Sequence, residues 1–168
     1  GPLVAISKQE VIRQNDTTPL LGSRLAEIGA QLIHDTLPKL ITGDFNAIGQ
    51  IETEATYCQI IKKEEGHVRW LEETAIEIER KLRAYIPWPG IFSFYSMPGN
   101  SEKKQRIQLT KVEVVSGDFE PGRIYPELIV GTLYSGLRIL RLKPEGKQEM
   151  DADSFLRGHP QIVGSVLA

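Results

Sequence analysis

The chain has 168 residues, of which 40% are hydrophobic and 25% are charged, and its formal net charge is −2. This is the composition of an ordinary soluble globular protein rather than of a disordered one, and no apolar run approaches the ~18 residues that a membrane span needs. The single cysteine, Cys58, excludes an internal disulfide and favours a reducing, cytoplasmic compartment. A near-neutral charge neither predicts nor excludes a basic, phosphate-binding face.

The first 45 residues predict an extended segment followed by one long helix. Val4 to Ile12 has the pattern of a strand, and without neighbours of its own it suggests a sheet that lies upstream. Thr18 as a capping residue and Pro19 as the first helical residue predict the helix start. Apolar residues at helical spacing continue to a terminator at Gly43. A start at Gly-Pro rather than Met suggests a chain cut from a longer parent.

A second unit is expected after a linker. Residues 46–62 show no periodicity and predict the linker, and residues 63–168 follow as the second unit. Within that unit, residues 72–86 predict an amphipathic helix, which Pro87 and the residues after it end. The side chains expected on its buried face are Ala75, Ile76, Ile78, Leu82 and Tyr85.

Beyond this helix the periodicity changes to that of short strands. Turn residues separate four β-branched or aromatic segments, at residues 91–95, 107–115, 124–134 and 137–142. A short closing helix is expected at residues 151–156. The predicted fold class is therefore α+β, with a long N-terminal helix and a small antiparallel, OB-like β-barrel against which one helix packs.

The titratable side chains do not predict a reaction centre. His34, His67 and His159 are far apart in the sequence and lack the paired spacing of a metal site. Cys58 is interpreted as a small packed thiol rather than a nucleophile. Glu64-Glu65 is interpreted as a solvated turn, because sequence neighbours point to different faces. No catalytic residue and no metal ligand is therefore expected.

Trp88 lies between two prolines, which restrict the backbone on both sides of the indole. The indole could be a stacking platform for RNA bases. Alternatively, the segment could be a rigid corner where the helix closes one end of the barrel and Trp88 fills the core. We favour the corner.

Basic side chains gather at a few places along the second unit. As a group they could form a track for a phosphate backbone, where each contact adds salt-dependent affinity without reading sequence. The alternative is an ordinary solvated surface. The candidate residues are Lys62, Lys63, Lys103, Lys104, Arg106, Arg138, Arg141, Lys143 and Lys147.

Several motifs resemble, in the same order, those of the methionyl-tRNA formyltransferase family. Residues 54–57, 63–66 and Trp70 are similar to the passage from linker to barrel in that family. Arg83-Ala84-Tyr85-Ile86-Pro87-Trp88-Pro89-Gly90 resembles its RAFNPWPG signature, and residues 142–159 resemble its closing segment. Arg69 stands where the family often has Asp, and Ile60 occupies a usually basic linker position. Lys63 is therefore the safest tRNA contact to carry over.

The resemblance implies an upstream catalytic domain, which would bind 10-formyltetrahydrofolate and hold the catalytic Asn, His and Asp. Residues 1–45 would be the tail of that domain, 46–62 a linker, and 63–168 an OB-like domain that supports initiator methionyl-tRNA. The chain alone would then be inactive and free of cofactors. Its partners would be the tRNA and its own upstream domain, and we expect a monomer that binds no membrane.

Two other interpretations remain open. The chain could belong to another folate-dependent formyltransferase, or to a formyl hydrolase, that acts on a small molecule. It could also be a purely structural brace for the catalytic domain.

Overall fold

The computed structural model describes residues 1–97 and 100–168, except for the side chains of residues 97 and 100–103. The chain divides into two units, Gly1–Ile60 and Ile61–Ala168, each with its own internal contacts. The predicted linker, residues 46–62, spans this division.

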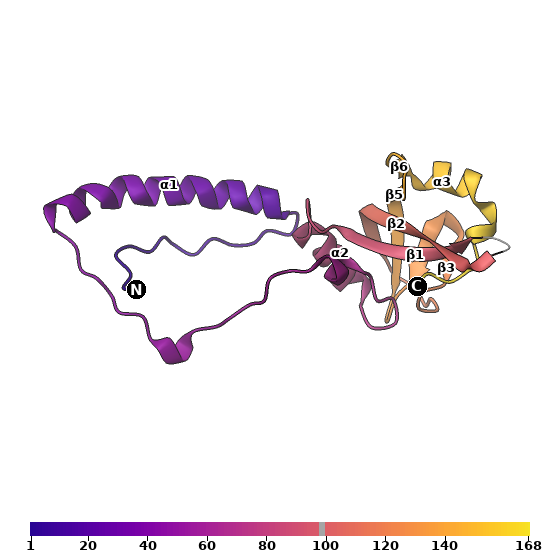
Figure 1. Ribbon diagram of the computed structural model, residues 1–168, viewed down its shortest axis with the longest axis horizontal. Helices are drawn as coiled ribbons and strands as arrows, with labels where there is room; N and C mark the ends of the chain where they lie inside the picture. The colour runs from indigo at the N-terminus through magenta and orange to yellow at the C-terminus, as the bar shows by residue number, and fades with distance from the viewer. Residues whose placement is uncertain (98–99) are drawn as a thin grey trace. The chain divides into compact units, whose positions relative to one another are not determined.

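The first unit contains the long helix α1, Thr18–Thr42, which the sequence predicted (Figure 1). Its N-cap is Thr17 rather than Thr18, and Pro19 lies in its first turn as expected. Gly43 ends the helix in the left-handed region, with φ 75°, a conformation that costs glycine little because it has no Cβ. Within the described chain, α1 has no buried residue.

Residues 4–12 form no strand within the described chain, and their expected pairing with a sheet upstream stays a prediction. These residues are extended, but the described part of the first unit offers them no sheet, and its only ladder contact is an antiparallel bridge between Leu3 and Ile48. Ion pairs of Arg24 instead hold the segment against α1, with Nε 2.9 Å from Glu10 Oε1 and Nη1 2.6 Å from Asp16 Oδ1. The Arg24 guanidinium and the Arg13 amide hold the pKa of Asp16 well below its usual range.

In the second unit, α2 spans Ala75–Ala84 and is held by a reciprocal cap. The Thr74 hydroxyl accepts a hydrogen bond from the Glu77 amide, and the Glu77 carboxylate accepts one from the Thr74 amide. Ala75, Ile78 and Leu82 are buried as predicted, but Ile76 is 51% exposed. Ile76 lies about 100° around the helix from Ala75, off the buried stripe.

The strands of the second unit form one antiparallel sheet, with six strands in the described residues. The order is β1-β2-β5-β4-β3, and β6 pairs with β5. The predicted α+β class is confirmed. The strands are β1 Ile91–Met97, β2 Asn100–Val115, β3 Ile124–Tyr125, β4 Ile129–Gly131, β5 Gly136–Pro144 and β6 Met150–Asp151. The segment predicted at 124–134 is split by a 3-10 turn, Pro126–Leu128, in which Glu127 and Leu128 have positive φ.

The described strands do not close a barrel by pairing with one another, contrary to the prediction. β1 and β3 are the two edges, and β3 has only two residues with which to form a ladder. Residues 164–168 run between these edges instead. Ala168 and Phe94 exchange two backbone hydrogen bonds, of 2.9 and 3.0 Å, and Ile124 donates to the Ser165 carbonyl at 2.9 Å.

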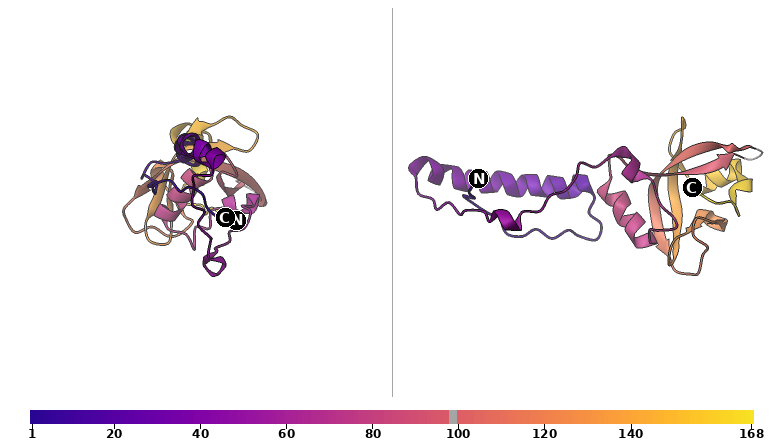
Figure 2. Two further views of the ribbon diagram at one scale, coloured as in Figure 1. Left: turned by 90° about the vertical axis from the view of Figure 1, so that its left-hand side faces the viewer. Right: turned by 60° about the horizontal axis from the view of Figure 1, so that its bottom comes forward.

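The sheet and its helices enclose a single apolar core. α2 and the closing helix α3, Ala152–Gly158, lie toward opposite ends of the sheet (Figures 1 and 2), and both contribute side chains to this core. Trp70 is only 3% exposed, and its Nε1 donates to Ser93 Oγ at 2.9 Å. The expectation that Trp88 fills the core is wrong, because Trp88 is 58% exposed and the tryptophan in the core is Trp70.

Replacing Ser93 with Ala removes the partner of the buried Trp70 N–H. Ser93 Oγ also donates to the Ala168 carbonyl at 2.8 Å, so the change leaves polar groups unsatisfied. We expect the free energy of unfolding, measured by urea denaturation with tryptophan fluorescence, to fall by about 1–3 kcal/mol. Ser96→Ala, at an exposed position of β1, is the matched control and should change it by less than about 0.5 kcal/mol. Equal effects of the two variants would contradict this account.

The cap of α2 predicts a pH dependence. The hydrogen bonds from Thr74 hold the pKa of the Glu77 carboxyl below its usual range. Stabilisation by ionised Glu77 is therefore complete above the unfolded pKa of about 4.3, and is lost as the pH falls through the lower pKa of the folded state. Wild type should be more stable than Glu77→Gln at neutral pH, and urea denaturation should show this difference shrinking in acid. A difference that is independent of pH would rule out the carboxylate's role.

Candidate nucleic-acid interface

One face of the sheet carries aromatic and basic side chains side by side. Directly paired residues of antiparallel strands share a face, and Phe94 of β1 lies opposite Arg106 of β2. Gln108 of β2 lies between Phe92 of β1 and Lys143 of β5. The residues of β2 that alternate with these, Ile107 and Leu109, point into the core. We define the outer face by these side chains: Phe92, Phe94, Lys104, Arg106, Gln108 and Lys143.

Arg106 is fixed at the centre of the outer face. Its guanidinium carbon lies 4.0 Å from the centre of the Phe92 ring, and His67 stacks with the same ring at a centroid distance of 5.5 Å. Among the described residues, Arg106 has no carboxylate within 4.0 Å, and its buried Nε has no hydrogen-bond partner. Stacking thus holds a cation in place without neutralising it, an arrangement suited to binding an anion.

The predicted lysines lie at three places: on the outer face, in the turn after β5 and at the start of η2. Lys104 and Lys143 are exposed on the outer face, and Lys147 is exposed in the turn after β5. Lys62 and Lys63 are exposed at the start of the 3-10 helix η2, Lys63–Gly66. In the described part of the chain none of these five has a carboxylate within salt-bridge distance. The side chain of Lys103, also predicted, lies outside the described residues.

The other two predicted arginines are occupied by carboxylates. Arg138 lies 3.2 Å from Glu113 Oε2 and 3.0 Å from Glu127 Oε2. Arg141 lies 3.2 Å from Glu149 Oε2. The Thr110 hydroxyl and Arg141 hold the pKa of Glu149 below its usual range, so this carboxylate stays charged. Both arginines therefore offer a phosphate less net charge than Arg106 does.

A hollow beside α2 contains titratable groups, but these groups make hydrogen bonds and ion pairs that hold the fold together. Lys81 Nζ donates to Glu73 Oε1 at 2.8 Å and to the His67 carbonyl at 2.9 Å. Glu65 accepts from the Lys62 amide at 2.9 Å and from the Tyr85 hydroxyl at 3.3 Å. Burial raises the pKa of Tyr85. These contacts anchor η2 to α2 and leave no group placed for acid–base chemistry.

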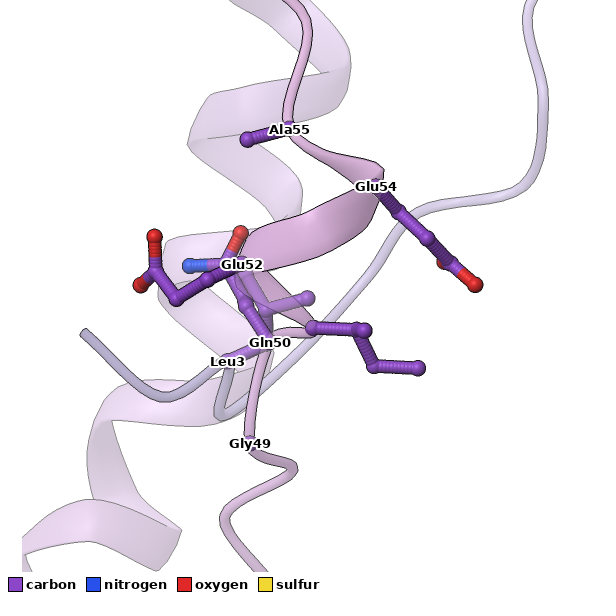
Figure 3. Close-up of a pocket in the computed structure, with 7 residues that line it drawn as sticks. Leu3, Gly49, Gln50, Glu52, Glu54 and Ala55 are labelled. Carbon is purple, nitrogen blue, oxygen red and sulfur yellow. The ribbon is translucent and has the colours of Figure 1, made fainter.

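The first unit has a hollow of its own, lined by Leu3 and by residues 49–52, 54 and 55. Its titratable groups are the carboxylates of Glu52 and Glu54, whose side chains point apart in Figure 3. Cys58 is exposed, contrary to the packed thiol that the sequence suggested. Across residues 1–97 and 100–168, no cluster of His, Cys, Asp or Glu is arranged to hold a metal ion. No helix in these ranges is both long and apolar enough to cross a membrane.

Sequence reasoning missed the aromatic part of the interface. His67, Phe92 and Phe94 form a contact cluster, with Phe92 and Phe94 edge-to-face at 5.7 Å. The signal was present, because Phe92 and Phe94 are two residues apart in a predicted strand and so share a face. Their position under Arg106 depends on the β1–β2 register, which the sequence alone does not give.

Comparison with known proteins identifies the family. Residues 60–160 match the family model described as formyl transferase, C-terminal domain, and the chain belongs to this family.

The relatives extend the similarity beyond the matched domain. The chain is 34% identical over 167 residues to the methionyl-tRNA formyltransferase of Caldanaerobacter subterraneus, covering 96% of the chain and 52% of the relative. It is 35% identical over 161 residues to the enzyme of that name from Thermodesulfovibrio yellowstonii, covering 94% and 49%. The chain thus spans about half the length of these curated relatives.

A solved structure shares the fold. A multiply substituted variant of HypX from Aquifex aeolicus matches with a TM-score of 0.60 at 16% identity. The match covers 90% of this chain and 28% of HypX.

The difference between free and paired arginines is testable with a short RNA duplex. Arg106→Gln should lower the slope of log affinity against log salt by roughly 0.9, the value for one lost phosphate contact. Arg141→Gln, the matched control, should change the slope much less, because Glu149 already neutralises that side chain. Fluorescence anisotropy at several salt concentrations measures both slopes. Equal slope changes would contradict the assignment of Arg106 as the better anion site.

Proposed function

We propose that this chain is the C-terminal, tRNA-supporting part of a methionyl-tRNA formyltransferase. In the complete enzyme, the formyl group of 10-formyltetrahydrofolate would be transferred to the amino group of initiator methionyl-tRNA. Similarity to enzymes of that name along more than nine-tenths of the chain supports the proposal. The observation that carries it is the outer face, where a stacked arginine and exposed lysines lack carboxylate partners among the described residues.

The proposed division of labour follows the sequence. Residues 1–45 would belong to the catalytic domain, whose remaining part would cover the apolar side chains that α1 leaves exposed. Residues 46–62 would be the linker, and residues 63–168 the tRNA-binding domain. We regard that domain as OB-like, with residues 164–168 taking the place of direct pairing between the edge strands.

The chemical contribution of this part would be binding and orientation. Lys63, Lys104 and Arg106 would contact phosphates, which position the tRNA without reading its sequence. Holding two reactants in place converts a bimolecular reaction into an effectively unimolecular one, and this can supply a large part of a rate enhancement. The formyl donor and the catalytic groups would belong to the upstream domain. We propose that the enzyme acts as a monomer in the cytoplasm, where one such face would hold one tRNA.

The test measures initiator tRNA binding by the chain as the salt concentration rises. We expect weak affinity that falls steeply with salt, and no formyl transfer when 10-formyltetrahydrofolate and methionyl-tRNA are supplied. Combined replacement of Lys63, Lys104 and Arg106 by Gln should lower the salt slope by roughly 2–3, about 0.9 for each contact. Fluorescence anisotropy with labelled tRNA gives the slope.

Three outcomes would overturn the proposal or part of it. Equal, salt-insensitive binding of tRNA and an unrelated acidic polymer would remove the case for a phosphate track. Absence of tRNA affinity would favour the alternative of a formyltransferase or formyl hydrolase that acts on a small molecule. An unchanged slope in the triple variant would favour a purely structural brace.

A further inference from the structure

The exposed tryptophan is unusual because its backbone is firmly held. Trp88 is 58% exposed, while Pro89 and Gly90, which follow it, are buried. The Gly90 amide donates to the Tyr85 carbonyl at 2.9 Å, which closes the turn between α2 and β1. Prolines on both sides restrict the backbone further. The indole is therefore presented to solvent from a fixed turn, whose backbone loses little conformational entropy on binding.

The turn adjoins two elements that carry cationic residues. It touches η2, because a Cβ at Gly66 would lie 2.3 Å from the Gly90 carbonyl oxygen. Lys63 stands at the other end of that four-residue helix. The turn also touches the outer face, because a Cβ at Gly90 would lie 2.5 Å from Gln108 Nε2. The turn is therefore next to the helix that begins at Lys63 and next to the face that carries Arg106.

An exposed aromatic ring on a turn next to elements that carry unpaired cations fits single-stranded nucleic acid. The cations contact phosphates, and the ring stacks on a base, whichever base it is, since every base has a π-face. A duplex does not offer such a face, because its bases are already stacked. An apolar protein partner fits less well, since the exposed residues of η2 and its N-cap are all charged: Lys62, Lys63, Glu64 and Glu65.

We propose that Trp88 is a stacking site for an unpaired nucleobase of an RNA whose phosphates contact the η2 lysines and the outer face. This inference rests on the proposed function, because it needs an RNA held by these cations. Stacking would add a contact that depends much less on the salt concentration than the phosphate contacts do.

Intrinsic fluorescence gives a direct test with the full chain. Trp70 is buried and hydrogen-bonded, so a quencher at the surface reaches only Trp88. A single-stranded oligoadenylate of about eight nucleotides, within the usual site size, should quench the exposed fraction of the signal. Inorganic polyphosphate, which has charge but no bases, should not. Quenching by polyphosphate as strong as that by oligoadenylate would overturn the stacking assignment.

Variants separate stacking from charge. Trp88→Ala should weaken oligoadenylate binding roughly tenfold while leaving the salt slope unchanged, and Trp88→Phe should retain most of the affinity. Lys63→Gln should instead lower the slope by about 0.7, the value for one contact to a single strand. A short RNA duplex should bind Trp88→Ala and wild type equally. The exposed position of Trp88 makes misfolding of these variants unexpected, and circular dichroism checks it.

The outcomes distinguish the inference from the function on which it rests. If Trp88→Ala binds oligoadenylate as tightly as wild type while Lys63→Gln lowers the slope, stacking is wrong and phosphate binding stands. Equal losses for duplex and single strand in Trp88→Ala would also overturn stacking, in favour of a general surface contact. If wild type binds neither RNA, both proposals fail.

Discussion

The backbone hydrogen bonds of residues 164–168 join the two edges of the sheet in the second unit. The sheet has two edges that do not reach each other, and this segment joins them by bonding to Phe94 on one edge and Ile124 on the other. The same segment receives the hydrogen bond from Ser93, the partner of the buried Trp70. Closure of the sheet, satisfaction of the core tryptophan and placement of β1 therefore depend on the same few residues. Since β1 supplies Phe92 and Phe94, the geometry of the outer face depends on them as well.

Acidic and basic side chains of this protein are separated locally, although its net charge is close to zero. The net charge is slightly negative, and two predicted basic residues, Arg138 and Arg141, face carboxylates. Arg106 faces an aromatic ring instead, which attracts the guanidinium through its π-face but does not cancel its charge. A nearly neutral protein can thus offer a polyanion a cationic surface. Net charge is a poor guide to such a surface, because the pairing of each arginine decides its availability.

Local signals in the sequence predicted the elements well. Proline in the first turn and Gly43 at the end located α1, and β-branched or aromatic runs between turn residues located β1 and β5. The split of the segment 124–134 was not predictable, because it depends on positive φ at Glu127 and Leu128, which non-glycine residues seldom adopt. The joining of the two sheet edges by residues 164–168 was also not predictable, since these residues have no strand periodicity. In the candidate site, the basic positions could be found from the sequence, but whether each pairs with a carboxylate depends on the folded arrangement of the strands. Trp88 was misassigned because the local pattern does not show which of two tryptophans enters the core.

The lack of buried residues in α1 has a consequence for how the chain unfolds. An isolated helix gains little from its own hydrogen bonds and owes most of its stability to tertiary packing. The second unit, by contrast, has a buried core that includes Trp70, Phe155 and Leu142. Loss of helical ellipticity should therefore begin before the change in tryptophan emission, and the two transitions should not coincide. A single melting temperature would then describe neither unit, because the two-state approximation requires that all probes report one event.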